Sequence, residues 1–93
     1  MTNLKEKVVF ITGASSGIGA ACAMAFAGAG ADLVLAARRL DRLEGMTNAL
    51  VAAGAGAVHC AGLDVRDQPE VQRTVDHLPE KFRNITVLVN NAG

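Results

Sequence analysis

The chain has 93 residues, 51% of them hydrophobic, which is enough for one small core and limits it to one domain or part of one. Nine basic and nine acidic residues give a formal net charge of +0, which excludes a protein-wide field attracting nucleic acid or an anionic membrane. The uncharged stretch 14–31 is mostly Ala, Gly and Ser, so we expect no membrane span there. No export signal is evident either, and we expect a cytoplasmic protein.

The first predicted element is a strand at 8–12, a continuous apolar run of the kind buried on both faces of a parallel sheet. A glycine-bearing turn follows, and apolar residues at helical spacing then predict a helix that ends at Gly28 and Gly30. The side chains that we expect this helix to bury are those of Ile18, Ala21, Cys22, Ala25, Phe26 and Ala29.

A second strand and a second helix are predicted next. Residues 33–37 are apolar throughout and predict the strand. Residues 41–44 match the capping box at a helix start, and Gly54 predicts the helix end. The expected apolar stripe of this helix consists of Leu40, Leu43, Met46, Leu50 and Val51. A weaker strand at 57–63 follows it.

The last helix begins at residues 67–70, which repeat the pattern of a helix start with a proline that the first turn tolerates. We expect Pro79 to kink or fray its last turn, and residues 85–89 predict a fourth strand. The expected buried face consists of Val71, Val75, Leu78 and Phe82. Because helices connect successive strands, the sequence predicts an α/β fold, one half of a doubly wound parallel sheet.

The turn Thr12-Gly13-Ala14-Ser15-Ser16-Gly17-Ile18-Gly19 lies where ligands bind in such sheets, beyond the carboxyl ends of the strands. A helix beginning near Ser16 or Gly17 would direct free backbone N–H groups and the positive end of its dipole at a phosphate. The glycine spacing matches neither G-x-G-x-x-G nor the P-loop, and Ala20 and Ala21 stand where a P-loop needs Lys and Ser or Thr. This excludes a P-loop NTPase. The alternative is that the turn is only a tight connection.

Three motifs together resemble a known family. The turn at 12–19, Asp64-Val65 and Asn90-Asn91-Ala92-Gly93 look like the amino-terminal half of a short-chain dehydrogenase/reductase, and the resemblance covers the whole chain. It implies a Rossmann-like βαβαβαβ fold with strand order 3-2-1-4, in one partial dinucleotide-binding domain, 1–93, that ends at the NNAG motif. Within the family, residues 63–67 and 78–85 look like the NADP-dependent hydroxy-acid dehydrogenase type, reductases acting on small hydroxy acids or related polar carbonyls.

The residues after the second strand indicate which nicotinamide dinucleotide is bound. In such folds an acidic residue there hydrogen-bonds the adenosine ribose of NAD, whereas arginine accommodates the 2′-phosphate of NADP. This chain has Arg38 and Arg39, and Asp32 lies at the opposite end of the strand. We therefore expect NADP(H) to be preferred, with NAD(H) possible, with Arg38 on the phosphate and Arg39 stacking on adenine or sharing the charge. Alternatively, both arginines are solvated residues at a helix start.

The third and fourth strand ends supply the remaining contacts that the resemblance implies. Asp64 would accept from the exocyclic amine of adenine and the Val65 backbone would meet the ring edge, the alternative being that Asp64 only caps a turn. Asn90 would lie beside the adenosine ribose, while Asn91 braces neighbouring loops through its amide. The expected cofactor-binding residues are Gly13, Ser15, Ser16, Gly17, Ile18, Gly19, Arg38, Arg39, Asp64, Val65, Asn90, Ala92 and Gly93.

The family's chemistry relies on a Ser and a Tyr-x-x-x-Lys motif in the later half, where the tyrosine transfers the proton. This sequence contains no tyrosine, so we expect no catalytic residue in it and no activity of the 93-residue chain alone. One interpretation is an NADP(H)-binding half of an oxidoreductase that moves hydride between the nicotinamide and an alcohol or carbonyl. The other is a truncated or designed half-fold that binds nucleotide or self-assembles without catalysis.

The remaining expectations concern metals and partners. Cys22 and Cys60 lack C-x-x-C spacing, and His59 and His77 complete no metal-ligand pattern, so no metal site is expected. Neither nucleic acid nor a membrane is expected as a partner. The strand at 85–89 would form a sheet edge with no lysine or proline to discourage pairing, so we expect a homo-oligomer joined there.

Overall fold

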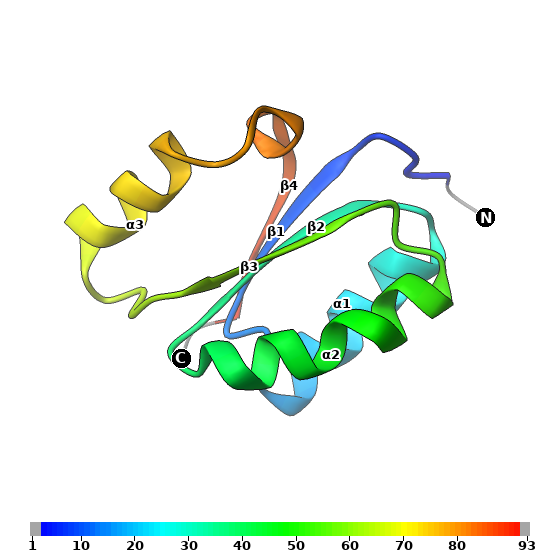
Figure 1. Ribbon diagram of the computed structural model, residues 1–93, viewed down its shortest axis with the longest axis horizontal. Coiled ribbons are helices and arrows are strands. Elements are labelled where there is room, and N and C mark those ends of the chain that lie inside the picture. Colours follow the sequence, from blue (N-terminus) through cyan, green and yellow to red (C-terminus); the bar gives the residue numbers. More distant parts are fainter. Residues whose placement is uncertain (1–2, 92–93) are drawn as a thin grey trace.

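Strands and helices alternate along the chain, as the sequence predicted (Figure 1). The structure is a computed structural model, which describes residues 3–91. Its elements are β1 (Val8–Thr12), α1 (Gly17–Gly28), β2 (Asp32–Ala37), α2 (Leu40–Ala53), β3 (Val58–Gly62), α3 (Gln68–Asp76), the short 3-10 helix η1 (Glu80–Phe82) and β4 (Ile85–Asn90). Each strand boundary lies within one residue of its predicted position.

The four strands form one parallel sheet in the order β3-β2-β1-β4, which confirms the Rossmann-like topology. Helices α1 and α2 cover one face of this sheet, and α3 with η1 lies on the other (Figure 1). In the strand register, Thr12 lies opposite both Ala36 and Asn90, and Ala36 lies opposite Ala61. The carboxyl ends of all four strands therefore meet at one edge, where sheets of this kind bind ligands.

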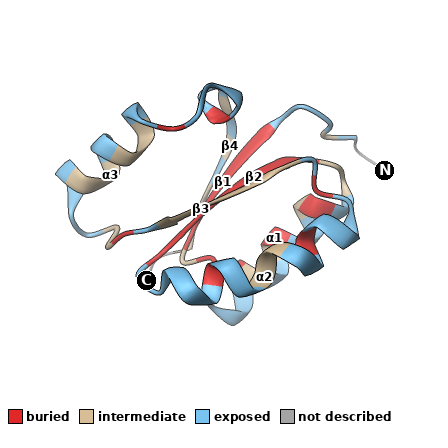
Figure 2. Cartoon of the chain, in the orientation of Figure 1, coloured by how far each residue is buried: buried red, intermediate tan, exposed pale blue. Residues whose placement is uncertain are grey.

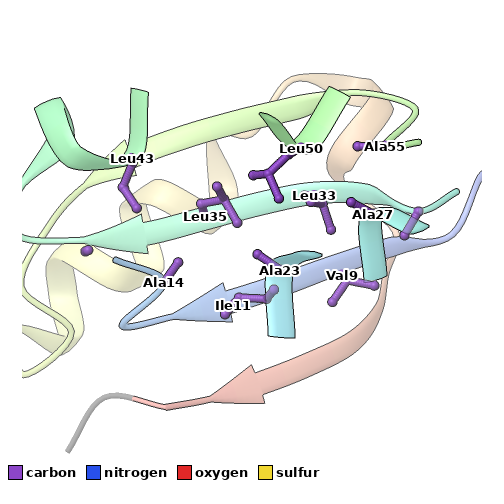
Figure 3. Close-up of a cluster of buried hydrophobic side chains, with 12 residues drawn as sticks. Val9, Ile11, Ala14, Ala23, Ala27, Leu33, Leu35, Leu43, Leu50 and Ala55 are labelled. Atoms are coloured by element: carbon purple, nitrogen blue, oxygen red, sulfur yellow. The ribbon is translucent and has the colours of Figure 1, made fainter. Parts of the chain in front are cut away.

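The face of the sheet under α1 and α2 holds the larger buried cluster (Figure 3). Alternate residues of β1 and β2 point toward the two helices, as the twofold repeat of a strand requires. The labelled side chains of this cluster are Val9, Ile11, Ala14, Ala23, Ala27, Leu33, Leu35, Leu43, Leu50 and Ala55. Because burying one large aliphatic side chain contributes about 1.5–3 kcal/mol, this cluster fixes both helices to the sheet.

The opposite face is more thinly covered. Helix α3 has no fully buried residue, so its attachment depends on residues that follow it (Figure 2). Asp67 caps the helix as predicted, because its side chain accepts from the backbone N of Glu70 at 3.1 Å. The buried cluster on this face contains Val8, Phe10, Val34, Ala36, Leu63, Leu78 and Phe82. Leu78 and Phe82 are buried as expected but lie beyond the end of α3, whereas Val71 and Val75 are only partly buried.

The predicted buried face of α1 is wrong. The residues that α1 buries are Gly19, Ala23 and Ala27, whereas Ile18 is 72% exposed. Ala21 and Ala25 are also exposed, and the remaining predicted residues are only partly buried. Small side chains at every fourth position let the helix backbone approach the sheet closely. This close packing of the backbone outweighs the burial of larger apolar side chains. An Ala- and Gly-rich helix offers little contrast from which to predict its buried face.

The predicted capping box of α2 is also wrong. The helix begins at Leu40 with Arg39 as the N-cap, and no side chain caps it. Asp41 lies inside the first turn, with its Oδ1 3.5 Å from Arg39 Nε. Two residues of the predicted stripe, Leu40 and Val51, are exposed, while Leu43 and Leu50 are fully buried and Met46 partly so. The helix stops before Gly54, as predicted, because Gly54 adopts a φ of 125°.

No helix within residues 3–91 is long and apolar enough to cross a membrane. The same residues contain no group of three or more His, Cys, Asp and Glu side chains that would hold a metal ion. Both cysteines are free thiols and half-buried. Burial raises the pKa of the Cys60 thiol, whose Sγ lies 3.7 Å from Thr47 Oγ1.

Candidate functional site

A groove of about 440 Å³ opens at the carboxyl ends of β1, β2 and β3. Its walls come from the β1–α1 turn, the β2–α2 turn and the loop after β3, with Asn91 added from the end of β4. Its lining residues are Gly13, Ser15, Ser16, Ala37, Arg38, Arg39, Arg42, Leu63, Asp64, Val65, Arg66 and Asn91. Segments far apart in the sequence therefore share one groove at the edge where this sheet type binds ligands.

The β1–α1 turn brings the start of α1 to the groove. Gly13 has a φ of 61°, a conformation that other residues rarely adopt. Ser16 caps the helix: its Oγ donates to Gly13 O at 2.9 Å and accepts from Gly19 N at 3.3 Å. The first N–H groups of a helix have no partner within it, so those of Gly17 and Ile18 are available to an anion.

Asn91 ties the end of β4 to this turn. Its side-chain Nδ2 donates to Gly13 O at 3.3 Å and to Ser16 Oγ at 2.8 Å. Its backbone N donates to Thr12 Oγ1 at 3.1 Å, and that hydroxyl in turn lies 3.2 Å from Asn90 Oδ1. The bracing role expected for Asn91 is thus confirmed. Thr12, for which no separate role was predicted, joins the same network.

Three arginines follow β2 at the groove. Arg38 and Arg39 were predicted there, and Arg42 extends the same positive wall from the first turn of α2. Arg39 Nε lies 3.5 Å from Asp41 Oδ1. Because both side chains are largely exposed, this ion pair contributes little to stability. Arg42 was missed, because residues 41–44 were interpreted as a capping box rather than as part of the site.

The loop after β3 contributes an ion pair. Arg66 Nη2 lies 2.9 Å from Asp64 Oδ2, and Arg66 Nε donates to Oδ1 at 3.1 Å. These hydrogen bonds from Arg66, with a smaller contribution from the charge of Arg38, lower the pKa of Asp64 to about 2. The backbone N of Arg66 also donates to Oδ1, so Asp64 does cap a turn, the alternative role considered above. Its contact with adenine stays a prediction.

Asp32 lies at the other end of the sheet, as predicted. It is paired in register with Val8 at the start of β1 and is only 5% exposed. Its Oδ2 lies 3.7 Å from Lys81 Nζ, which attaches η1 to the amino end of β2. Asp32 is therefore not a lining residue of the groove.

The structure brings most of the predicted site residues together. Those that line the groove are Gly13, Ser15, Ser16, Arg38, Arg39, Asp64 and Val65. Gly17, Ile18, Gly19 and Asn90 are not among the lining residues, although each lies in or next to a segment that contributes one. Ala92 and Gly93 lie outside the described residues. Arg42 and Arg66 were not predicted as site residues, because Arg42 was interpreted only as part of a capping box and Arg66 only as part of the stretch 63–67.

Comparison with known proteins identifies the family. The family model described as short chain dehydrogenase matches residues 7–93. The chain belongs to the short-chain dehydrogenase family. The match includes all four strands of the sheet and every segment that lines the groove.

Individual members of this family are similar over nearly the whole chain. Sulfoacetaldehyde reductase 2 from Chromohalobacter salexigens is 50% identical over 86 residues, which are 92% of this chain and 33% of the relative. The solved structure of L-sorbose reductase from Gluconobacter frateurii, with NADPH and L-sorbose, has a TM-score of 0.88 at 39% identity. That comparison covers 99% of this chain and 35% of the other.

A third similar protein is a metagenomic short-chain oxidoreductase solved in complex with NADP. Its TM-score is 0.88 at 34% identity, over 97% of this chain and 40% of that one. The chain therefore spans about a third of the length of the curated relative above, and 35% and 40% of the two solved chains. Of these two solved structures, the first contains NADPH and the second contains NADP.

Proposed function

We propose that the groove binds the adenosine end of NADP(H). The chain is then the cofactor-binding part of an oxidoreductase that moves hydride between the nicotinamide and an alcohol or carbonyl substrate. The bound cofactor supplies the hydride chemistry, and this chain binds and orients it. NAD(H) is a possible second ligand with lower affinity. Family membership and the two solved relatives with NADPH or NADP support the proposal.

The observation that carries the proposal is the charge at the carboxyl end of β2. A carboxylate there would accept from the ribose hydroxyls of NAD and repel the 2′-phosphate of NADP. This strand instead ends beside Arg38 and Arg39, with Arg42 on the same wall, while its one acid, Asp32, lies at the far edge. Arginine pairs well with phosphate through two parallel hydrogen bonds. The preference for NADP(H) follows from this arrangement.

The other groups of the groove fit the rest of the adenosine diphosphate. Apart from its chain neighbours and its own helix backbone, no heavy atom lies within 4 Å of the position where a Cβ on Gly17 would be, so a ligand has room to approach the main chain. The start of α1 then receives the pyrophosphate. In this proposal Asp64 and Val65 meet the adenine and Asn90 meets the ribose, as in the family that the chain belongs to.

Chemical-shift mapping by NMR tests whether the dinucleotide binds in this groove. On addition of NADP⁺ to the isotopically labelled chain, we expect the amide resonances of Gly17, Ile18 and Arg38 to shift. Those of Asp32 and Lys81, at the opposite edge of the sheet, are expected to stay in place. The fragment 2′,5′-ADP is expected to shift the same amides, because it contains the adenosine and the 2′-phosphate. Shifts confined to the Asp32 edge would contradict the proposed site.

The substrate class belongs to the same proposal. The sequence resemblance to enzymes of small hydroxy acids and polar carbonyls agrees with the sulfoacetaldehyde reductase at 50% identity, whose name describes a small charged aldehyde. We propose a small polar carbonyl or alcohol as substrate. The half-buried free thiols Cys22 and Cys60 suit the reducing cytoplasm that we propose as the compartment.

The alternative function is a binding module that assembles without catalysis. One observation favours it: β4 is an edge of the described sheet, and its Leu88 is 66% exposed. An exposed apolar edge strand invites pairing with a second chain. We propose that the chain, residues 1–93 as one partial Rossmann domain, forms a homo-oligomer through β4. The 93-residue sequence contains no tyrosine, so we propose that it has no activity by itself.

A further inference from the structure

The Asp64 carboxylate is held by Arg66 at every hydrogen bond that it makes within residues 3–91. Its Oδ1 accepts from the backbone N of Arg66 at 2.9 Å and from Nε at 3.1 Å. Its Oδ2 accepts from Nη2 at 2.9 Å. A guanidinium that donates through two nitrogens to two carboxylate oxygens fixes the orientation of the carboxylate as well as its charge.

This pairing leaves one acceptor position on Asp64. A carboxylate oxygen has two lone pairs, and Oδ1 already accepts two hydrogen bonds. Oδ2 accepts one, so its second lone pair is the position left for a ligand. Asp64 and Arg66 both line the groove that the arginines after β2 also line.

We propose that Arg66 is a positioning residue for recognition of the base. It aligns Asp64 so that the remaining lone pair of Oδ2 accepts one N–H of the exocyclic amine of adenine. The groove then prefers adenine over a purine that has a carbonyl at this position, such as hypoxanthine. The inference rests on the proposed function, because it concerns how the same groove recognises the dinucleotide.

The chemistry of the two bases gives this preference its direction. The amine of adenine donates hydrogen bonds, whereas the carbonyl of hypoxanthine offers only lone pairs. The charged groups that face Asp64 are Arg66 and Arg38, and both lower its pKa. At neutral pH the carboxylate is therefore ionised and can only accept. A carbonyl facing it loses the hydrogen bond and adds repulsion, a contact that discriminates against the wrong base.

Calorimetric titration of the full chain with NADP⁺ and with its hypoxanthine analogue tests the proposal. We expect the wild type to bind the adenine form at least about threefold more tightly, the lower range for one hydrogen bond. In Arg66→Ala the ratio of the two affinities is expected to approach one, because the remaining backbone hydrogen bond holds only Oδ1 and no longer fixes the direction of Oδ2. In Asp64→Asn it is expected to approach one or invert, since an amide can donate to the carbonyl.

Two further variants separate positioning from charge. Arg66→Lys keeps the charge but loses the paired planar donors. The ratio of its affinities for the adenine and hypoxanthine forms is therefore expected to be close to one, as in Arg66→Ala. Arg73→Ala is the matched control, because Arg73 lies on α3 and does not line the groove; it is expected to keep the wild-type ratio.

The outcomes distinguish this proposal from the one on which it rests. A wild-type ratio in Arg66→Ala or Arg66→Lys would overturn the positioning role of Arg66. A ratio of one in the wild type, with both dinucleotides bound, would overturn base recognition by Asp64 and leave the proposed function standing. No binding of either dinucleotide to the wild type would overturn the proposed function itself.

Discussion

Gly17 and Gly19 lie two residues apart at the start of α1, but their surroundings are opposite. Apart from its chain neighbours and its own helix backbone, a Cβ on Gly17 would meet no heavy atom within 4 Å. A Cβ on Gly19 would clash with the Gly13 carbonyl oxygen and lie 2.9 Å from Asn91 Nδ2. Gly19 therefore permits the packing of the turn, whereas the space beside Gly17 is open, and we propose that the ligand uses it.

The first prediction compares these two glycines. Gly19→Ala is expected to destabilise the fold by about 1–3 kcal/mol, the usual cost of overpacking. Gly17→Ala is expected to leave the free energy of unfolding unchanged or slightly raised, because alanine has the better helix propensity, and to weaken NADP⁺ binding. Urea unfolding and calorimetric titration measure the two effects. Equal stability losses in both variants would contradict the roles assigned to them.

The second prediction concerns the titration of Asp64. Its pKa is lowered from 3.8 to about 2, so the interaction with Arg66 stabilises the fold above pH 3.8 and is lost as pH falls toward 2. In Arg66→Ala the pKa is expected to rise toward its ordinary value, with the backbone hydrogen bond from residue 66 and the smaller influence of Arg38 remaining. Carbon-detected NMR of the carboxyl group measures both midpoints. An unchanged midpoint in the variant would exclude the Arg66 side chain as the cause.

At the scale of elements, the strands were predicted well and the helix faces poorly. Strands β1 and β2 are buried on both sides, so their unbroken apolar runs marked their positions directly. Helix α1 is mostly Ala and Gly, and its buried face follows close backbone packing rather than side-chain hydrophobicity. Asn91 was expected to brace neighbouring loops. Its specific partner, Ser16, was not predictable, because the two residues are distant in sequence and their contact depends on the strand register.

The third prediction concerns the edge strand β4. Leu88→Lys is expected to convert an oligomer to a monomer, because a charged side chain on an edge strand opposes pairing with another chain. Leu88 is the suitable position since it is exposed, whereas Val87 packs against the cluster beneath α1 and α2. Light scattering at about 100 μM, a concentration at which even a weak micromolar complex would form, measures the change. A wild-type chain that is monomeric at this concentration would contradict assembly through β4.

At the scale of the whole molecule, the chain corresponds to part of the fold of its family members. It matches the family model over residues 7–93 while spanning 33% of its sulfoacetaldehyde reductase relative. Every contact proposed here lies on the adenosine side of the cofactor. The topology and the glycine turn were predictable because they follow from local pattern and a specific motif. The roles of Arg42 and Arg66 were not, because no periodicity or motif in the sequence determines which groups these side chains contact.

The fourth prediction is that the 93-residue chain binds NADP(H) weakly and does not turn it over. A dissociation constant of about 0.1–1 mM is expected, because few groups share the cost of immobilising the ligand. Calorimetry gives the affinity, and absorbance at the nicotinamide band gives the oxidation rate with a small polar aldehyde. NADPH oxidation by the purified chain, after contaminating reductases are excluded, would contradict the proposed absence of a catalytic group.

The central claim, that Arg38 makes this groove a site for the 2′-phosphate, is tested most directly by the affinities for NADP⁺ and NAD⁺ in the wild type and in Arg38→Ala. A charge-assisted hydrogen bond at an exposed site predicts that the variant binds NADP⁺ about tenfold more weakly and NAD⁺ almost unchanged. Arg73→Ala, on α3, is expected to change neither affinity. Equal losses for both dinucleotides in Arg38→Ala, or a wild type that binds NAD⁺ as tightly as NADP⁺, would contradict the claim.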